Sequence, residues 1–255
     1  MIQACGVSDT GRVRKTNEDK FISDPEFRLF AVADGMGGHS AGEVASRLAI
    51  EALTGFIRRS AADTDFSWPY GLDKTLSFDG NRLRTAVHLA NRKVFRAAES
   101  SDDYNGMGTT IVSVLVGDDR ISVAHVGDSR MYLVSNGQIA QLTFDDTWAA
   151  TILAQDPSLD PAEIARHPMR NVLTNVLGAR DHVDVHLTEC SVSPGDLLLL
   201  CTDGLHGVLD ADTLKATMTS APNAESAARA LVESALDGGG RDNTTALVVR
   251  YEGIS

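Results

Sequence analysis

Cysteine and long apolar runs are both scarce in this chain of 255 residues. An odd set of cysteines at wide spacing fits neither a disulfide framework nor a zinc site, so we expect buried thiols in a reducing compartment. The three are Cys5, Cys190 and Cys201. No uninterrupted apolar run reaches the roughly 18 residues of a transmembrane helix, which excludes a membrane span. The first residues place positive charge after a short apolar patch, the reverse of a secretory signal. We therefore expect a soluble protein of the cytoplasm.

Positive charge is also in short supply. The 23 lysines and arginines are outnumbered by 35 aspartates and glutamates, which gives a formal net charge of -12. This balance argues against a nucleic-acid-binding protein, because such proteins neutralise phosphates with basic faces. With 43% apolar residues, the chain can bury a sizeable core, and its length favours one domain over residues 1–255. We expect that domain to be a monomer.

Apolar runs bounded by Gly, Asp and Asn predict seven strands. They are residues 2–7, 27–34, 109–117, 120–127, 130–135, 196–202 and 244–251. Turns of three residues, Gly117–Asp119 and Gly127–Ser129, separate the middle three strands and are too short for a helical crossover, so these strands are predicted to form an antiparallel meander. Helical periodicity predicts helices over residues 41–59, 81–100, 211–219 and 224–236. Strands paired with their sequence neighbours and helices grouped elsewhere favour an α+β fold.

Two stretches fit neither periodicity. Residues 60–80 contain Pro and Gly breaks and are expected to form an exposed connection between the first two helices. Residues 145–170 combine short helical pieces with three prolines, which predicts a small mobile subdomain over a site. Ser40 and Glu43 have the spacing of a capping box at the start of the first helix.

Aspartates stand at the ends of four predicted core strands. Asp34 is followed by Gly35, Asp203 by Gly204, Asp128 follows Gly127, and Asp242 precedes the last strand. A single Asp-Gly after a strand is usually a turn, and the sequence alone leaves open whether the four converge. If they do, like charges at short range cost several kcal/mol unless cations compensate. A set of hard oxygen ligands without a Cys or His cluster selects Mg²⁺ or Mn²⁺.

Three further residues could serve such a centre. The absence of a side chain lets the Gly35 carbonyl approach an ion. Arg14 precedes Glu18 by four residues, and this segment is either a solvated turn with local salt bridges or part of the site. In the second case the planar guanidinium of Arg14 binds phosphate oxygens, while Glu18 holds a metal-bound water.

Six motifs in this order resemble the bacterial branch of the PP2C-type (PPM) metal-dependent serine/threonine protein phosphatases. The resemblance spans residues 6–250 and rests on RVRKTNED, AVADGMGGHSAGE, GMGTTIVSVLV, AHVGDSRMYLV, LLLCTDGL and RDNTTALVV. It implies an α-β-β-α sandwich of two antiparallel sheets flanked by helices. The segment 145–170 corresponds to the family's flap subdomain, which influences substrate choice.

The resemblance also implies a role for each site residue. Asp34 would bridge two metal ions, Mn²⁺ or Mg²⁺, and Asp203 with Asp242 would hold one of them. The other would be held by the Gly35 carbonyl and, through water, by Glu18. Asp128 with Asp203 matches the third metal site of bacterial members. Arg14 corresponds to the phosphate-binding arginine.

These assignments imply hydrolysis of phosphoserine and phosphothreonine by a water or hydroxide that bridges two metal ions. The proton donor to the leaving alkoxide is left open, because many eukaryotic members have His after the metal-binding Asp-Gly, whereas this chain has Met36. Met36 is interpreted as a packing residue, and His39 is either structural or a donor.

Two rival classes of enzyme that cleave phosphate bonds lack their motifs here. A cysteine-dependent phosphatase requires Arg six positions after its Cys, and no cysteine of this chain has one. A nucleotide-hydrolysing P-loop requires a Lys that the glycines near the N-terminus lack. The remaining alternative is a catalytically inactive relative that binds phosphorylated partners. Expected partners are phosphorylated proteins, including a cognate Ser/Thr kinase and its substrates. The 60–80 connection resembles that of PP2C-like members encoded with type VI secretion systems.

Overall fold

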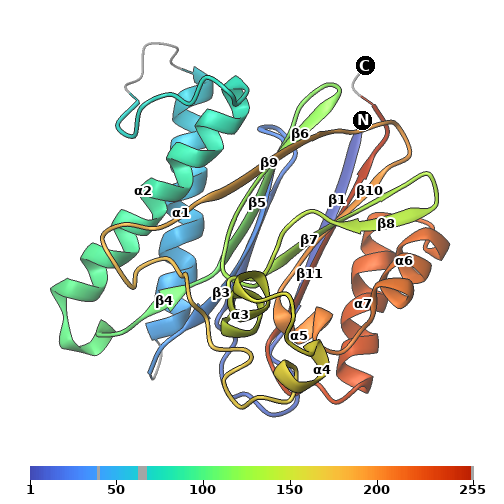
Figure 1. Ribbon diagram of the computed structural model, residues 1–255. Helices are drawn as coiled ribbons and strands as arrows, with labels where there is room; N and C mark the ends of the chain where they lie inside the picture. The colour runs from blue at the N-terminus through green and yellow to red at the C-terminus, as the bar shows by residue number, and fades with distance from the viewer. Residues whose placement is uncertain (39–40, 63–67, 254–255) are drawn as a thin grey trace.

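Two antiparallel sheets lie face to face, and helices cover the outer side of each sheet (Figure 1). The computed structural model describes residues 1–38, 41–62 and 68–253. Four layers in the order helix, sheet, sheet, helix give the α+β sandwich expected from the sequence, so that prediction is confirmed. No helix within the described ranges is long and apolar enough to cross a membrane.

The first sheet packs against the two longest helices. Its strand order is β2 (Asp19–Asp24), β3 (Leu29–Met36), β5 (Ile111–Val116), β6 (Arg120–Val126) and β9 (His186–Ser191), and the short β4 (Gly108–Thr109) pairs with β3. The helices are α1 (Ala41–Ala62) and α2 (Phe78–Ser100), followed by a turn of 3₁₀ helix, η1 (Asp102–Tyr104). Ser77 caps α2 by accepting a hydrogen bond from the Gly80 amide. The proposed capping residue Ser40 lies outside the described residues.

The second sheet packs against the C-terminal helices. Its order is β1 (Ile2–Asp9), β11 (Thr244–Tyr251), β10 (Leu197–Cys201), β7 (Arg130–Ser135) and β8 (Gln138–Gln141). The helices are α6 (Ala211–Ser220) and α7 (Ala224–Asp237), and the single turn α5 (Asp203–His206) follows β10 directly. Cys201 is buried here, whereas Cys5 and Cys190 are only partly buried, so the expectation of three buried thiols was wrong for two of them.

The central strands are buried on both faces. In β5, Ile111 and Leu115 pack under the helices, while Val112 and Val114 pack between the two sheets. Alternate residues of a strand point to opposite faces, so a strand covered on both sides must be apolar at nearly every position. This explains why the sequence carries continuous apolar runs here.

The predicted meander is wrong at its second turn. β5 and β6 do pair, but β6 belongs to the first sheet and β7 to the second, so the chain crosses from one sheet to the other at Gly127. Gly127 has a φ of 96°, and a Cβ atom there would lie 2.7 Å from Cγ2 of Thr110. A side chain is therefore excluded at this corner. A turn of this length permits pairing but does not require it.

The segment 145–170 contains the short helices that its sequence indicates. α3 (Trp148–Gln155) is capped by Thr147, and α4 (Pro161–Ile164) by Asp160. In Figure 1, α3 lies in front of the strand ends between the two sheets, and α4 lies below it in the view. The chain then returns along the pocket described below, which Asn171 and Leu173 line.

Candidate active site

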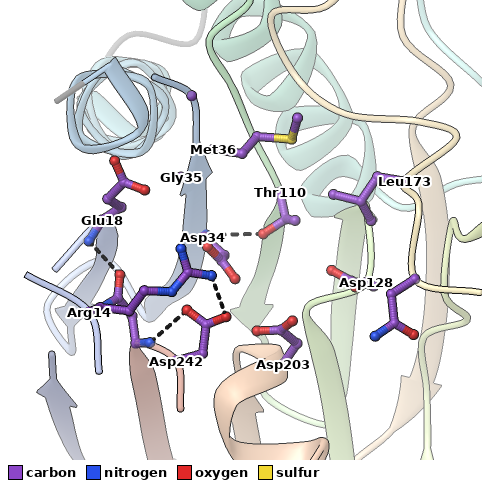
Figure 2. A pocket seen from close by; sticks show the side chains of 13 residues that line it. Arg14, Glu18, Asp34, Gly35, Met36, Thr110, Asp128, Leu173, Asp203 and Asp242 are labelled. Carbon is purple, nitrogen blue, oxygen red and sulfur yellow. Dashed lines mark hydrogen bonds and ion pairs between the residues drawn. The ribbon is translucent and has the colours of Figure 1, made fainter. Parts of the chain in front are cut away.

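Four aspartates from separate segments line one pocket. Asp34 lies near the end of β3, Asp203 begins α5, Asp242 precedes β11, and Asp128 occupies the corner between β6 and β7. In Figure 2 the carboxylates of Asp34, Asp203 and Asp242 face a common space, and Asp128 lies farther along the same pocket. The structure thus brings together the carboxylates that the sequence places at strand ends. Three other predicted residues also line this pocket: Arg14, Glu18 and Gly35.

The backbone of Asp34 is held by the neighbouring strand. Its amide donates to Oγ1 of Thr110 (3.0 Å), and its carbonyl accepts from the Thr110 amide (2.9 Å) and from Oγ1 of Thr109 (2.8 Å). The next residue, Gly35, faces the start of α1, where a Cβ atom would collide with the carbonyl of Gly42. Glycine is required here for close packing, whether or not its carbonyl binds an ion.

The loop that carries Arg14 and Glu18 is fixed by Asn243. The side-chain amide of Asn243 donates to the carbonyls of Thr10 and Thr16, each at 2.9 Å, and its oxygen accepts from the Glu18 amide at 2.8 Å. The carboxylate of Glu18 points toward the start of α1 (Figure 2), where a Cβ atom on Gly42 would lie 2.7 Å from its carboxylate carbon. Glu18 therefore lies at the side of the pocket nearest α1, next to the carboxylates that face Asp34.

Arg14 forms an ion pair with Asp242. Nη2 of Arg14 lies 2.7 Å from Oδ2 of Asp242, and about half of the arginine side chain is exposed. This hydrogen bond is the main cause that raises the pKa of Arg14 above its ordinary value. Arg14 is the only basic residue among the described residues that line the pocket, so one cation faces several carboxylates.

The carboxylates lie in an environment that disfavours their charge. Burial, and then the charges of Asp19 and Asp203, raise the pKa of Asp34 well above its ordinary value. Burial and the charge of Asp242 raise the pKa of Asp203. Burial and the charge of Asp203 raise the pKa of Asp128 to about 7. A divalent cation would relieve both the desolvation and the repulsion.

The donor set fits a hard divalent cation. Oδ1 of Asp203 is buried and has no hydrogen-bond partner among the described residues, and an uncompensated buried carboxylate oxygen is costly. Every candidate ligand supplies oxygen, as Mg²⁺ and Mn²⁺ prefer. Within the described part of the chain, no three His, Cys, Asp or Glu side chains stand close enough to hold an ion as they are.

Of the two residues discussed in connection with the proton donor, the structure describes only Met36. Met36 is 41% exposed and lines the pocket, so its interpretation as a packing residue was wrong. Because successive side chains of a strand point to opposite faces, Met36 points into the pocket, whereas Gly35 faces α1. His39 lies outside the described residues.

Comparison with known proteins identifies the family. A family model described as Protein phosphatase 2C matches residues 12–237. The chain belongs to the protein phosphatase 2C family. Serine/threonine protein phosphatase PstP of Mycobacterium tuberculosis is 39% identical over 241 residues, which cover 94% of this chain and 43% of PstP. The chain thus spans less than half the length of that relative.

Two solved structures are also similar to this chain. The catalytic domain of PstP in complex with two manganese ions is 36% identical, covers 98% of this chain and 97% of its own, and superposes with a TM-score of 0.79. PppA of Pseudomonas aeruginosa, described as a key regulatory component of T6SS, is 32% identical, covers 98% and 97% respectively, and also has a TM-score of 0.79.

Sequence reasoning missed a fifth aspartate of this family member. Asp19 is 2% exposed and pairs in register with Asp34. Its Oδ2 accepts hydrogen bonds from the hydroxyls of Thr202 (2.9 Å) and Thr245 (2.7 Å), whereas its Oδ1 has no partner among the described residues. Burial raises its pKa to about 7. The available signal was its place directly after Glu18, in a segment for which a solvated turn and a part of the site were both left open.

Proposed function

We propose that this chain is a metal-dependent phosphoprotein phosphatase that hydrolyses phosphoserine and phosphothreonine. The observation that carries the proposal is the pocket in which an arginine with a half-exposed side chain faces five carboxylates, of which Asp128 is buried and the others are half-buried. Carboxylates bind metal ions and an arginine binds phosphate, so the two together match a phosphate ester held against cations. Membership of the protein phosphatase 2C family supports this assignment.

The metal ligands are those that the resemblance to the family implies. Asp34 would serve two ions, Asp203 and Asp242 one of them, and the Gly35 carbonyl with Glu18 the other; Asp128 and Asp203 would take a third. The unpartnered oxygen of Asp203 and the raised pKa of Asp34 support these roles. When bound, two Mn²⁺ or Mg²⁺ ions lower the pKa of a water toward neutrality, so that hydroxide can attack phosphorus in line with the leaving oxygen.

Arg14 would orient the phosphate. Its guanidinium has several N–H donors, of which one pairs with Asp242, so the others can bind phosphate oxygens while that ion pair holds the side chain over the pocket. The pairing with Asp242 also means that Arg14 is held in place before the phosphate enters.

Hydrolysis that depends on a metal ion is the first expected result. With Mn²⁺ the purified chain should release phosphate from p-nitrophenyl phosphate and from phosphothreonine peptides. EDTA should abolish both reactions, because the carboxylates alone supply no Lewis acid to activate water or to polarise the phosphate. Asp242→Asn should lose the activity. The matched control is Asp24→Asn, since Asp24 is a buried carboxylate paired with Arg58 at 2.6 Å outside the pocket. Full activity in EDTA, or phosphopeptide binding without hydrolysis, would contradict the proposal.

Replacing Arg14 with alanine should raise KM more than it lowers kcat. Hydrogen bonds to charged groups contribute about 1.5–3 kcal/mol, which corresponds to a rise in KM of roughly 10- to 100-fold. The check is steady-state kinetics on a phosphothreonine peptide. Arg12→Ala is the matched control, because Arg12 is also exposed and pairs with Asp237 at 3.0 Å. Equal KM values for the two variants would remove Arg14 from the phosphate site.

The partners would be phosphorylated proteins in the cytoplasm, among them a Ser/Thr kinase whose action this chain opposes. The acidic net charge of -12 and the family support a protein substrate rather than a nucleic acid. A link to type VI secretion stays a prediction, and the similarity to PppA supports it.

A further inference from the structure

The corner that carries Asp128 includes a glycine in the left-handed region of backbone conformation. Gly127 has no side chain and takes a φ of 96°, and the chain changes sheets at this point. Ser129 provides one tie, since its hydroxyl lies 2.7 Å from that of Thr110. The peptide groups of Gly127 and Asp128 depend on partners from elsewhere in the chain.

Asp146 binds the corner on one side. The Gly127 amide donates to Oδ2 of Asp146 (2.9 Å), and the Asp146 amide donates to the Gly127 carbonyl (3.1 Å). Both polar groups of Gly127 are thus satisfied by one residue at the base of the flap. Asp146 is only 8% exposed, so these hydrogen bonds are shielded from water.

Two other segments hold Asp146 in turn. Nε2 of His186, on β9, lies 2.9 Å from its Oδ1, and Nδ2 of Asn175 donates to its Oδ2 at 2.9 Å. Its carbonyl accepts from the Thr174 amide at 2.8 Å. Both carboxylate oxygens act only as acceptors, so an amide at this position would set its own N–H donors against a donor.

His206 binds the corner on the other side. Its Nε2 lies 3.0 Å from the carbonyl oxygen of Asp128, and because a carbonyl can only accept, Nε2 carries the hydrogen. His206 closes α5, the turn that Asp203 begins. The contact therefore links the segment of Asp203 to that of Asp128.

We propose that Asp146 and His206 are positioning residues that fix the Asp128 carboxylate against Asp203. The inference rests on the proposed function and names residues that act on the metal centre without facing the ions. It makes the Asp128-dependent ion sensitive to the flap, because Asp146 ties residues 174–175 of the returning chain to the same corner. Partners that orient metal ligands typically contribute about 10- to 100-fold in affinity.

The test is a Mn²⁺ titration in which free Mn²⁺ is counted by electron paramagnetic resonance. Asp128→Asn should lose one class of site, and Asp146→Asn and His206→Leu should weaken that same class by about 10- to 100-fold. His206→Gln should restore it, since the glutamine amide nitrogen can replace Nε2 as a donor to the Asp128 carbonyl. Asp24→Asn should bind as the wild type does, and thermal denaturation of each variant separates lost stability from lost binding.

A second measurement is hydrolysis at limiting and at saturating Mn²⁺. Asp146→Asn and His206→Leu should lose activity at limiting Mn²⁺ and recover much of it at saturation. Wild-type binding by both variants, or a full complement of Mn²⁺ on Asp128→Asn, would overturn the inference while wild-type hydrolysis still upheld the proposed function. A wild-type chain that neither bound Mn²⁺ nor released phosphate would overturn both.

Discussion

Replacement of Asp34 with asparagine is expected to reduce phosphate release by more than about 100-fold, the upper end of the effect of residues that merely orient metal ligands. Asp34 is the residue proposed to bind two ions, and the neutral side-chain amide of asparagine cannot compensate the positive charge of these ions. The measurement is kcat/KM for a phosphothreonine peptide at saturating Mn²⁺, with Mn²⁺ binding followed in parallel. Both should fall together.

The control for Asp34→Asn is Asp118→Asn. The Asp118 side chain is 81% exposed and pairs with Arg28 at 2.7 Å, so this change removes a carboxylate from a surface ion pair of little energetic consequence. A loss of activity in Asp118→Asn comparable to that in Asp34→Asn would mean that total charge, rather than the centre, governs the rate. An active Asp34→Asn variant would remove this residue from the metal ligands.

The strands missed by the sequence lie at sheet edges. β2, β8 and β9 each have one neighbour in their sheet, and two of them contain no fully buried residue. Periodicity detects burial, so the central strands with two apolar faces were predicted, whereas β1 was the only edge strand predicted among those that the structure describes. The wrong prediction of a meander has the same origin. Hydropathy indicates that β7 is buried, but it does not indicate to which of the two sheets β7 belongs.

The carboxylates of the pocket could be predicted where they stand next to the end of a strand. In each such case an acidic residue adjoins an apolar run, and this pattern can be recognised in the sequence alone. The residues are Asp34, Asp128, Asp203 and Asp242. The supporting residues cannot be recognised in this way, because their roles depend on contacts between distant segments. His206 contacts a residue 78 positions away and Asp19 one 226 positions away, and nothing in the local sequence distinguishes a histidine on a turn from one that orients a ligand.

Asp128→Asn should stabilise the metal-free protein, and the gain should grow with pH. The folded protein holds the pKa of Asp128 at about 7 against an ordinary value of 3.8. Between these values the folded state retains a proton that the unfolded state has released, so the wild type loses stability as pH rises. Asparagine resembles the protonated form and has no such loss. The difference should be near zero at pH 4 and approach about 4 kcal/mol at pH 8, at about 1.4 kcal/mol per pH unit.

The measurement is urea denaturation of both proteins in EDTA at several pH values. Comparing the two chains cancels the opposite contribution of His125 and His206, whose pKa values burial lowers to about 4 and which therefore stabilise the fold as pH rises toward 6.5. With Mn²⁺ the order should invert, because the ion binds the charged Asp128 and stabilises the wild type in proportion to its occupancy. A difference that stays constant from pH 4 to pH 8 would show that the pKa of Asp128 is the same in the folded and the unfolded state, which would contradict the effect of burial on this carboxylate.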